Sequence, residues 1–209
     1  CSSDLKQIEF CQGSGQSSKE RSRGITIFSK QANFVLGDKQ VTLLDTPGHV
    51  DFSAEMERTL QVLDYAILVV SGADGVQGHT RTLWNLLARY QVPTFIFINK
   101  MDQDGTDRQD RLTELKRKLS GECVDFTEAG EEFLEELSMC DETVMESYLE
   151  NGEITASQIQ TLIRERKVFP CYFGSALKLE GVQELLDGLG KYMDGPVSGT
   201  HAEEAFGAK

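Results

Sequence analysis

Residues 41–52 read Val41-Thr42-Leu43-Leu44-Asp45-Thr46-Pro47-Gly48-His49-Val50-Asp51-Phe52, and this stretch decides how the chain is organised. An apolar, strand-forming run ends at a carboxylate, a Pro-Gly turn follows, and the sequence then changes to helical periodicity. The pattern predicts a buried strand that brings Asp45 and His49 to the carboxyl edge of a sheet. Ligands of open α/β sheets bind at that edge.

The segments around this stretch predict an α/β fold. Residues 24–28 lead into residues 32–36, and a Gly-Asp turn then connects to residues 41–44, which predicts an antiparallel hairpin. Continuous apolar runs and helical periods then alternate along the chain. This alternation indicates a mostly parallel sheet with helices on both faces. The expected buried strands are 66–70, 94–98 and 168–173, and helices are expected near 83–90, 109–119 and 182–189, with a capping box from Thr155 to Gln158.

Charge and cysteine content narrow the class of protein. The net charge of −13 argues against a general nucleic-acid surface and against DNA as a partner. Twelve Asp and Glu residues and no Lys or Arg lie between Gly121 and Gln160, so the rest of the chain is close to neutral. This acidic, helically patterned segment is either a solvated face or a docking surface for a basic partner.

Membrane insertion and structural zinc are not expected. No apolar run approaches the roughly 20 residues that a bilayer-spanning helix needs. The five cysteines form no C-x-x-C pair. A reduced, cytoplasmic protein without a structural zinc site is the simplest interpretation.

Residues 99–102, Asn99-Lys100-Met101-Asp102, follow a predicted buried strand and carry groups suited to reading guanine. The Asp102 carboxylate accepts two hydrogen bonds from the ring N–H and the exocyclic amine of guanine, whereas adenine lacks both donors. Asn99 either addresses the other edge of the base or ties neighbouring loops together, and the Lys100 stem can cover the base plane. Ser175 and Ala176, after the last strand, are expected to offer backbone N–H groups to the guanine oxygen. We expect Asp45, Asn99 and Gly174 to lie side by side at one edge of the sheet.

The residues around the first strand end suit a metal-bound phosphate. Asp45 fits a carboxylate near Mg²⁺, an ion that keeps several waters and uses few protein ligands. The N–H of Gly48 can approach a terminal phosphate closely because glycine has no side chain. The Thr26 hydroxyl can complete the metal shell and report a γ-phosphate. His49 is the candidate catalytic residue, placed to orient an attacking water.

Four sequence motifs together resemble the G domain of translational GTPases, a P-loop NTPase-like fold. They are R-G-I-T-I (23–27), D-T-P-G-H-V-D-F (45–52), F-I-N-K-M-D (97–102) and G-S-A-L-K (174–178). Within that superfamily the chain is most similar to elongation factor G and to the tetracycline-resistance ribosome protection proteins. A peptide-chain release-factor GTPase is the other member that the motifs leave open.

The resemblance implies GTP hydrolysis to GDP and phosphate, with Mg²⁺, on the ribosome. It implies that the RNA loop of the large subunit places His49 for catalysis, and that an acidic, mainly helical insert near residues 121–166 docks the ribosomal stalk protein. The implied metal ligands are Thr26 and Asp45. The implied nucleotide-binding residues are Asp45, Thr46, Pro47, Gly48, His49, Asn99, Lys100, Met101, Asp102, Gly174, Ser175, Ala176 and Leu177.

Domain organisation follows from the same motifs. Residues 23–194 are expected to form the G domain, and the Gly- and Ala-rich residues 195–209 a linker toward a second domain. Residues 1–22 contain no G-x-x-x-x-G-K-[ST] phosphate loop, since Ser18 precedes Lys19 and Glu20 follows it. The sequence leaves two hypotheses. The chain is the G domain of a longer GTPase, or it is a nucleotide-incompetent fragment that acts through protein contacts.

Overall fold

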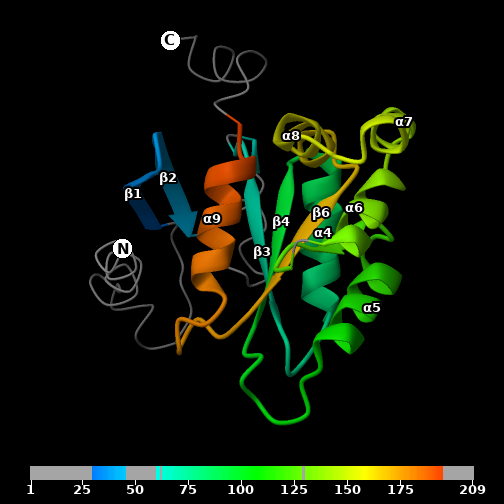
Figure 1. Cartoon of the computed structure of the whole chain (residues 1–209). Helices are drawn as coiled ribbons and strands as arrows, with labels where there is room; N and C mark the ends of the chain where they lie inside the picture. Colours follow the sequence, from blue (N-terminus) through cyan, green and yellow to red (C-terminus); the bar gives the residue numbers. More distant parts are fainter. Residues whose placement is uncertain (1–29, 46–59, 62, 129, 195–209) are drawn as a thin grey trace, which may run out of the picture. The chain divides into compact units, whose positions relative to one another are not determined.

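A computed structural model describes residues 30–45, 60–61, 63–128 and 130–194 of the chain (Figure 1). The chain divides into two compact units, Cys1–Gln61 and Val62–Lys209. None of the helices within the described ranges is long and apolar enough to cross a membrane.

The first unit contains the hairpin that the sequence predicts. Strand β1 (Lys30–Leu36) pairs antiparallel with β2 (Lys39–Asp45), with Leu36 opposite Lys39. Gly37 has a φ of 63°, the left-handed conformation that a two-residue hairpin turn requires. Strand β2 ends at Asp45, as expected. The predicted burial of this strand is wrong, because none of its residues is buried in the two-stranded sheet. The residues predicted to lead into the hairpin, 24–28, lie outside the described ranges.

The second unit is built on a four-stranded parallel sheet of order β3-β4-β6-β5. The three expected strands are present as β3 (Ala66–Ser71), β4 (Thr94–Asn99) and β6 (Phe169–Phe173). Strand β5 (Cys123–Asp125) was not predicted, because three residues within a helically patterned segment show no period of two. The α/β class and the parallel sheet are confirmed.

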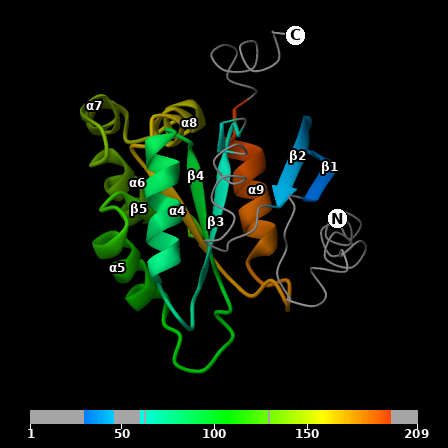
Figure 2. The ribbon, with the colours of Figure 1, turned by 180° about the vertical axis from the view of Figure 1, so that it is seen from behind.

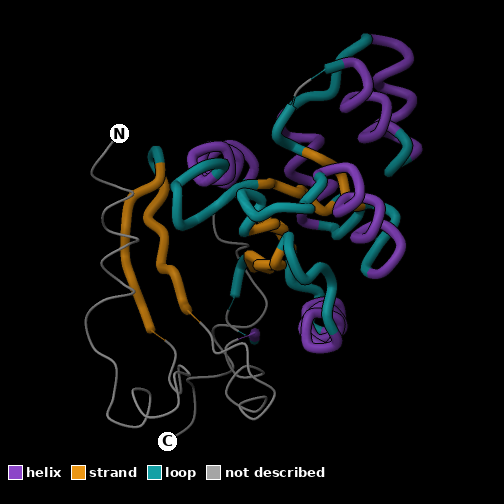
Figure 3. The backbone as a smooth tube through the Cα atoms, turned by 90° about the horizontal axis from the view of Figure 1, so that it is seen from below, coloured by secondary structure: helices purple, strands orange, loops and turns teal. Residues whose placement is uncertain are grey.

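Helices cover both faces of this sheet. Helices α4 (Gly78–Arg89) and α9 (Val182–Tyr192) lie on opposite faces, as Figures 1 and 2 show from the two sides and Figure 3 from below. Helix α5 (Arg108–Lys118) begins at Asp107, whose carboxylate accepts a hydrogen bond from Asp110 N at 2.9 Å. This N-cap satisfies one of the amide groups that a helix start leaves unpaired.

The acidic segment forms three short helices, α6 (Glu131–Ser138), α7 (Glu142–Asn151) and α8 (Ala156–Arg164). The predicted capping box is present at the start of α8. Gln158 N donates to Thr155 Oγ1 at 3.3 Å, and Thr155 N donates to Gln158 Oε1 at 2.8 Å. Helix α6 packs against β5 and α7, whereas α8 packs against α9. Helix α6 is therefore anchored to the sheet through β5, whereas α8 is anchored to α9.

Candidate functional site: the carboxyl edge of the parallel sheet

The ends of β4 and β6 lie side by side, as the sequence predicts for Asn99 and Gly174. Gly174 N donates to Ile98 O at 2.9 Å, and Met101 N donates to Gly174 O at 3.0 Å. Asn99 Oδ1 accepts hydrogen bonds from Lys100 N at 2.8 Å and from Ala176 N at 2.9 Å. Of the two roles considered for Asn99, the structure has it tying the two loops together.

Asp102 projects its carboxylate at this edge. Its Oδ2 atom forms an ion pair with Lys178 Nζ at 3.2 Å, and the Ser175 side chain also hydrogen-bonds the carboxylate. The Ser175 hydrogen bond, with Lys178 next, holds the pKa of the Asp102 carboxyl below its usual range. At neutral pH Asp102 is therefore an ionised acceptor held by two neighbours.

The loop after β6 is closed on itself by backbone hydrogen bonds. Ser175 N donates to Glu180 O at 3.0 Å, and Glu180 N donates to Ser175 O at 3.1 Å. A Cβ on Gly174 would lie 2.0 Å from Glu180 O, so only glycine fits this backbone approach. Leu177 stands at the exposed tip of the loop. The amides of Ser175 and Ala176, expected to face a guanine oxygen, have protein acceptors in this structure.

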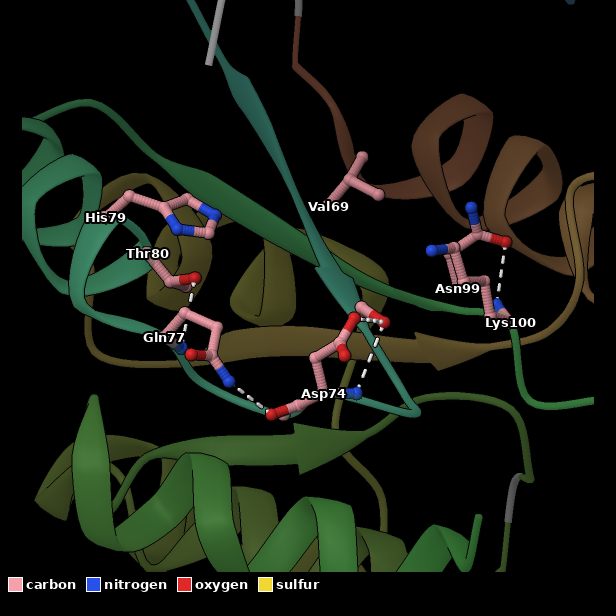
Figure 4. A pocket seen from close by; sticks show the side chains of 9 residues that line it. Val69, Asp74, Gln77, His79, Thr80, Asn99 and Lys100 are labelled. Carbon is pink, nitrogen blue, oxygen red and sulfur yellow. Dashed lines mark hydrogen bonds between the residues drawn. The ribbon is translucent and has the colours of Figure 1, made fainter. Parts of the chain in front are cut away.

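A cavity of about 480 Å³ opens beside Asn99 and Lys100 (Figure 4). Its other lining comes from the end of β3, the loop that follows and the first turn of α4. That loop is cross-linked by short hydrogen bonds, from Ser71 Oγ to Asp74 Oδ2 at 2.7 Å and from Gln77 Nε2 to Asp74 O at 2.5 Å. The lining residues are Val69, Ser71, Asp74, Gly75, Gln77, His79, Thr80, Asn99 and Lys100.

Sequence reasoning did not place residues 71–77 at the site. The signal was a Gly- and Asp-containing turn directly after a strand, which by itself indicates only a turn. Helix α5 also fixes this loop, because Val76 N donates to Glu114 Oε1 at 3.2 Å. Gly75 has a φ of 69°, and a Cβ there would meet the Arg111 and Glu114 side chains.

The predicted phosphate and metal residues are not tested by this geometry. Thr26, Thr46, Pro47, Gly48 and His49 lie outside the described residues. Asp45 is exposed at the end of β2 and belongs to the other unit, so its expected adjacency to Asn99 and Gly174 stays a prediction. Within the described ranges no three His, Cys, Asp or Glu side chains gather as a metal-binding group.

The chain is similar in sequence and in fold to known proteins. The chain is 38% identical over 189 residues to the tetracycline resistance protein TetM of Streptomyces lividans. The matched region covers 81% of this chain and 30% of TetM. The chain thus spans under a third of the length of this relative. A crystal structure of a protein from Thermus thermophilus superposes with a TM-score of 0.77 at 22% identity, over 95% of this chain and 36% of that one, and supports the fold.

The family model described as the elongation factor Tu GTP binding domain matches residues 4–194. This range contains all four sequence motifs, and it also includes most of residues 1–22. The likeness to translational GTPases that the motifs predict is therefore confirmed at the level of the family. The chain belongs to the elongation factor Tu GTP-binding domain family, the G domains of translational GTPases.

Proposed function

We propose that this domain binds GTP and GDP through the ends of β4 and β6 and that its parent protein hydrolyses GTP on the ribosome in the manner of a ribosome protection protein or elongation factor G. The observation that carries this proposal is the Asp102 carboxylate, which is held ionised beside the joined loops of Asn99 and Gly174. The neighbouring cavity of about 480 Å³ is within the size range of small-molecule sites.

Guanine selectivity follows from the chemistry of Asp102. Its carboxylate accepts from the ring N–H and the amine of guanine. Adenine has no donor at either position, so it makes neither of these hydrogen bonds. Asn99 joins the two loops that flank the base, and the Lys100 stem covers the base plane. Met101 and Leu177 complete the nucleotide-contacting set as the remaining members of the two motifs.

The first unit contains the residues that we propose for Mg²⁺ and the terminal phosphate. Asp45, an exposed carboxylate at the end of β2, fits Mg²⁺, which is held by few protein ligands and several waters. Thr26 is the proposed second ligand. Mg²⁺, when bound, neutralises charge on the phosphates. Thr46, Pro47 and Gly48 would line the terminal phosphate, and His49 would orient the attacking water when the large-subunit RNA places it.

The acidic helices are the proposed contact for the ribosomal stalk protein in the cytoplasm. Met139 and Leu149, on α6's end and on α7, are 74% and 77% exposed within a segment that carries no Lys or Arg. Apolar side chains amid carboxylates suit a basic partner with its own apolar face. The same observation favours the alternative function, a protein-binding module that does not bind nucleotide.

Base selectivity tests the proposal directly. Wild-type chain should bind GTP with Mg²⁺ in preference to ATP. Asp102→Asn should weaken GTP binding by about tenfold or more, because the amide of Asn presents a donor to a donor of guanine where the carboxylate presented an acceptor. The same variant should favour xanthosine triphosphate, because an amide donates to the carbonyl that replaces the guanine amine. Titration calorimetry measures all three affinities.

Asp104→Asn is the matched control, since Asp104 is an exposed carboxylate two residues further along the same loop. It should leave the GTP affinity unchanged. An unaltered base preference in Asp102→Asn contradicts the role of Asp102. If the wild-type chain binds no GTP, the proposed nucleotide site is wrong and the alternative function, a protein-binding module, remains.

The catalytic assignment has its own test in the full-length parent. His49→Ala should abolish ribosome-stimulated GTP turnover while the affinity for GTP stays unchanged, because orienting a water contributes to the transition state and not to ground-state binding. A parallel loss of affinity and turnover would show that His49 is a structural residue.

A further inference from the structure

Lys178 occupies an acceptor position on the carboxylate that is proposed to read guanine. Its Nζ lies 3.2 Å from Asp102 Oδ2. We propose that Lys178 is a positioning residue that holds the Asp102 carboxylate in the nucleotide-free domain, leaves Oδ2 when the guanine base binds, and returns when the base departs. This inference rests on the proposed function, since it assigns Lys178 a role in binding at the same site.

The base needs both oxygens of the carboxylate, and this makes Lys178, which lies on one of them, a competitor. An ionised carboxylate has about four lone-pair positions on its two oxygens. Guanine approaches with two donors in line, one for each oxygen. Ser175 and Lys178 already hydrogen-bond this carboxylate. Lys178 Nζ already shares Oδ2, one of the two oxygens that the base donors need, so the ammonium group and the base compete for that oxygen.

Burial decides which of the two partners yields. Ser175 is 1% exposed and its backbone amide is held by Glu180 O, so its hydroxyl stays in place. The Lys178 side chain is 52% exposed. A lysine stem has several rotatable bonds, and in water its ammonium group finds hydration when it leaves a partner. Lys178 is therefore the partner that moves.

The main chain of Lys178 allows this movement without opening the loop. Lys178 N donates to Ser175 O at 3.1 Å and lies 3.4 Å from Ser175 Oγ. The backbone at Lys178 is thereby tied to the residue that stays on Asp102. Only the side chain has to swing, and its departure leaves the loop after β6 in its closed form.

Competition from Lys178 is expected to lower the affinity for the guanine base only slightly and to favour exchange of the bound nucleotide. Exposed ion pairs contribute little, and removing such a competitor should tighten base binding by about two- to five-fold. A returning Lys178 also refills the carboxylate as the base leaves, which keeps Asp102 charged and oriented for the next nucleotide.

Nuclear magnetic resonance of the carboxyl carbon of Asp102 tests this inference on the whole chain. Guanosine is the ligand, because it has no phosphates and the loss of a lysine charge does not alter its attraction to the protein. Lys178→Met should bind guanosine about two- to five-fold more tightly than wild type. Lys178→Arg, which keeps the ion pair, should bind it as wild type does. In an Asp102→Asn background, Lys178→Met should have no effect.

Lys191→Met, at the far end of α9, is the control for a lost positive charge and should leave the guanosine affinity unchanged. The same spectra report the pair itself. In Lys178→Met the pKa of the Asp102 carboxyl should rise toward its ordinary value, with Ser175 still bonded to it.

The outcomes separate this inference from the proposed function. Guanosine binding that is unchanged or weakened in Lys178→Met, or an Asp102 carboxyl pKa that does not rise, overturns the role of Lys178 while guanine recognition stands. Absence of guanosine binding in every variant overturns the proposed function and this inference with it, even where the pKa reveals the ion pair.

Discussion

Strands β3 and β4 have similar sequences and unlike surroundings. Both are apolar runs that predict buried strands, Ala-Ile-Leu-Val-Val and Thr-Phe-Ile-Phe-Ile. The first five residues of β4 are buried, whereas Ile67 and Val69 of β3 are 37% and 58% exposed. Strand β4 lies between β3 and β6, and β3 is the last strand on its side of the described sheet. An apolar run thus predicts a strand but does not by itself predict cover on both faces.

The same substitution on each of the two strands measures this difference most strongly. Ile96 on β4 is fully buried and Ile67 on β3 is partly exposed. Ile96→Ala should lower the free energy of unfolding by about 2–5 kcal/mol, because it removes buried methyl groups and leaves a cavity. Ile67→Ala should cost about 1 kcal/mol or less, since part of its surface is already in water.

Urea denaturation of the two variants gives both values. Equal costs would contradict the comparison and show that Ile67 is covered in solution as Ile96 is.

The loops that follow the strands differ in how closely backbone approaches backbone. A Cβ on Gly174, after β6, would meet Glu180 O at 2.0 Å, while one on Gly72, after β3, would meet Met101 Sδ at 2.6 Å and Asn99 O at 3.1 Å. Gly174→Ala should therefore cost about 1–3 kcal/mol of unfolding free energy and weaken guanine binding, because the loop must open. Gly72→Ala should cost less, since the end of a Met side chain moves easily.

Thermal unfolding and GDP titration of this pair rank the two loops. A larger loss in Gly72→Ala than in Gly174→Ala would reverse the order of rigidity that the contacts give.

The smallest effect is expected at the exposed face of β3. Val69→Thr keeps the β-branched shape and adds a hydroxyl that water can bind, so the free energy of unfolding should change by no more than about 0.5 kcal/mol. The measurement is the urea midpoint beside that of wild type. A loss above about 1.5 kcal/mol would mean that the hydroxyl is buried and that this face is covered.

The sequence predicted much of the second unit and one part of the site. Strands β3, β4 and β6, the capping box of α8 and the meeting of Asn99 with Gly174 follow from local patterns and from the geometry of parallel strands. Strand β5 does not follow from a local pattern, because a strand of three residues depends on its pairing with β6. The tie from Val76 to Glu114, across 38 residues, leaves no local pattern either.

The amino-acid sequence by itself determined the strand-and-helix order and the motifs that identify the family, because periodicity, turns and capping depend on near neighbours. Tertiary structure alone decided that Asn99 joins two loops, that Lys178 lies on Asp102, and that one face of β3 is exposed. These facts depend on which distant segments meet, and side-chain reach and burial then set which groups are paired. The sequence therefore predicted which functional residues lie at the carboxyl edge, but it did not predict which distant side chains bind them.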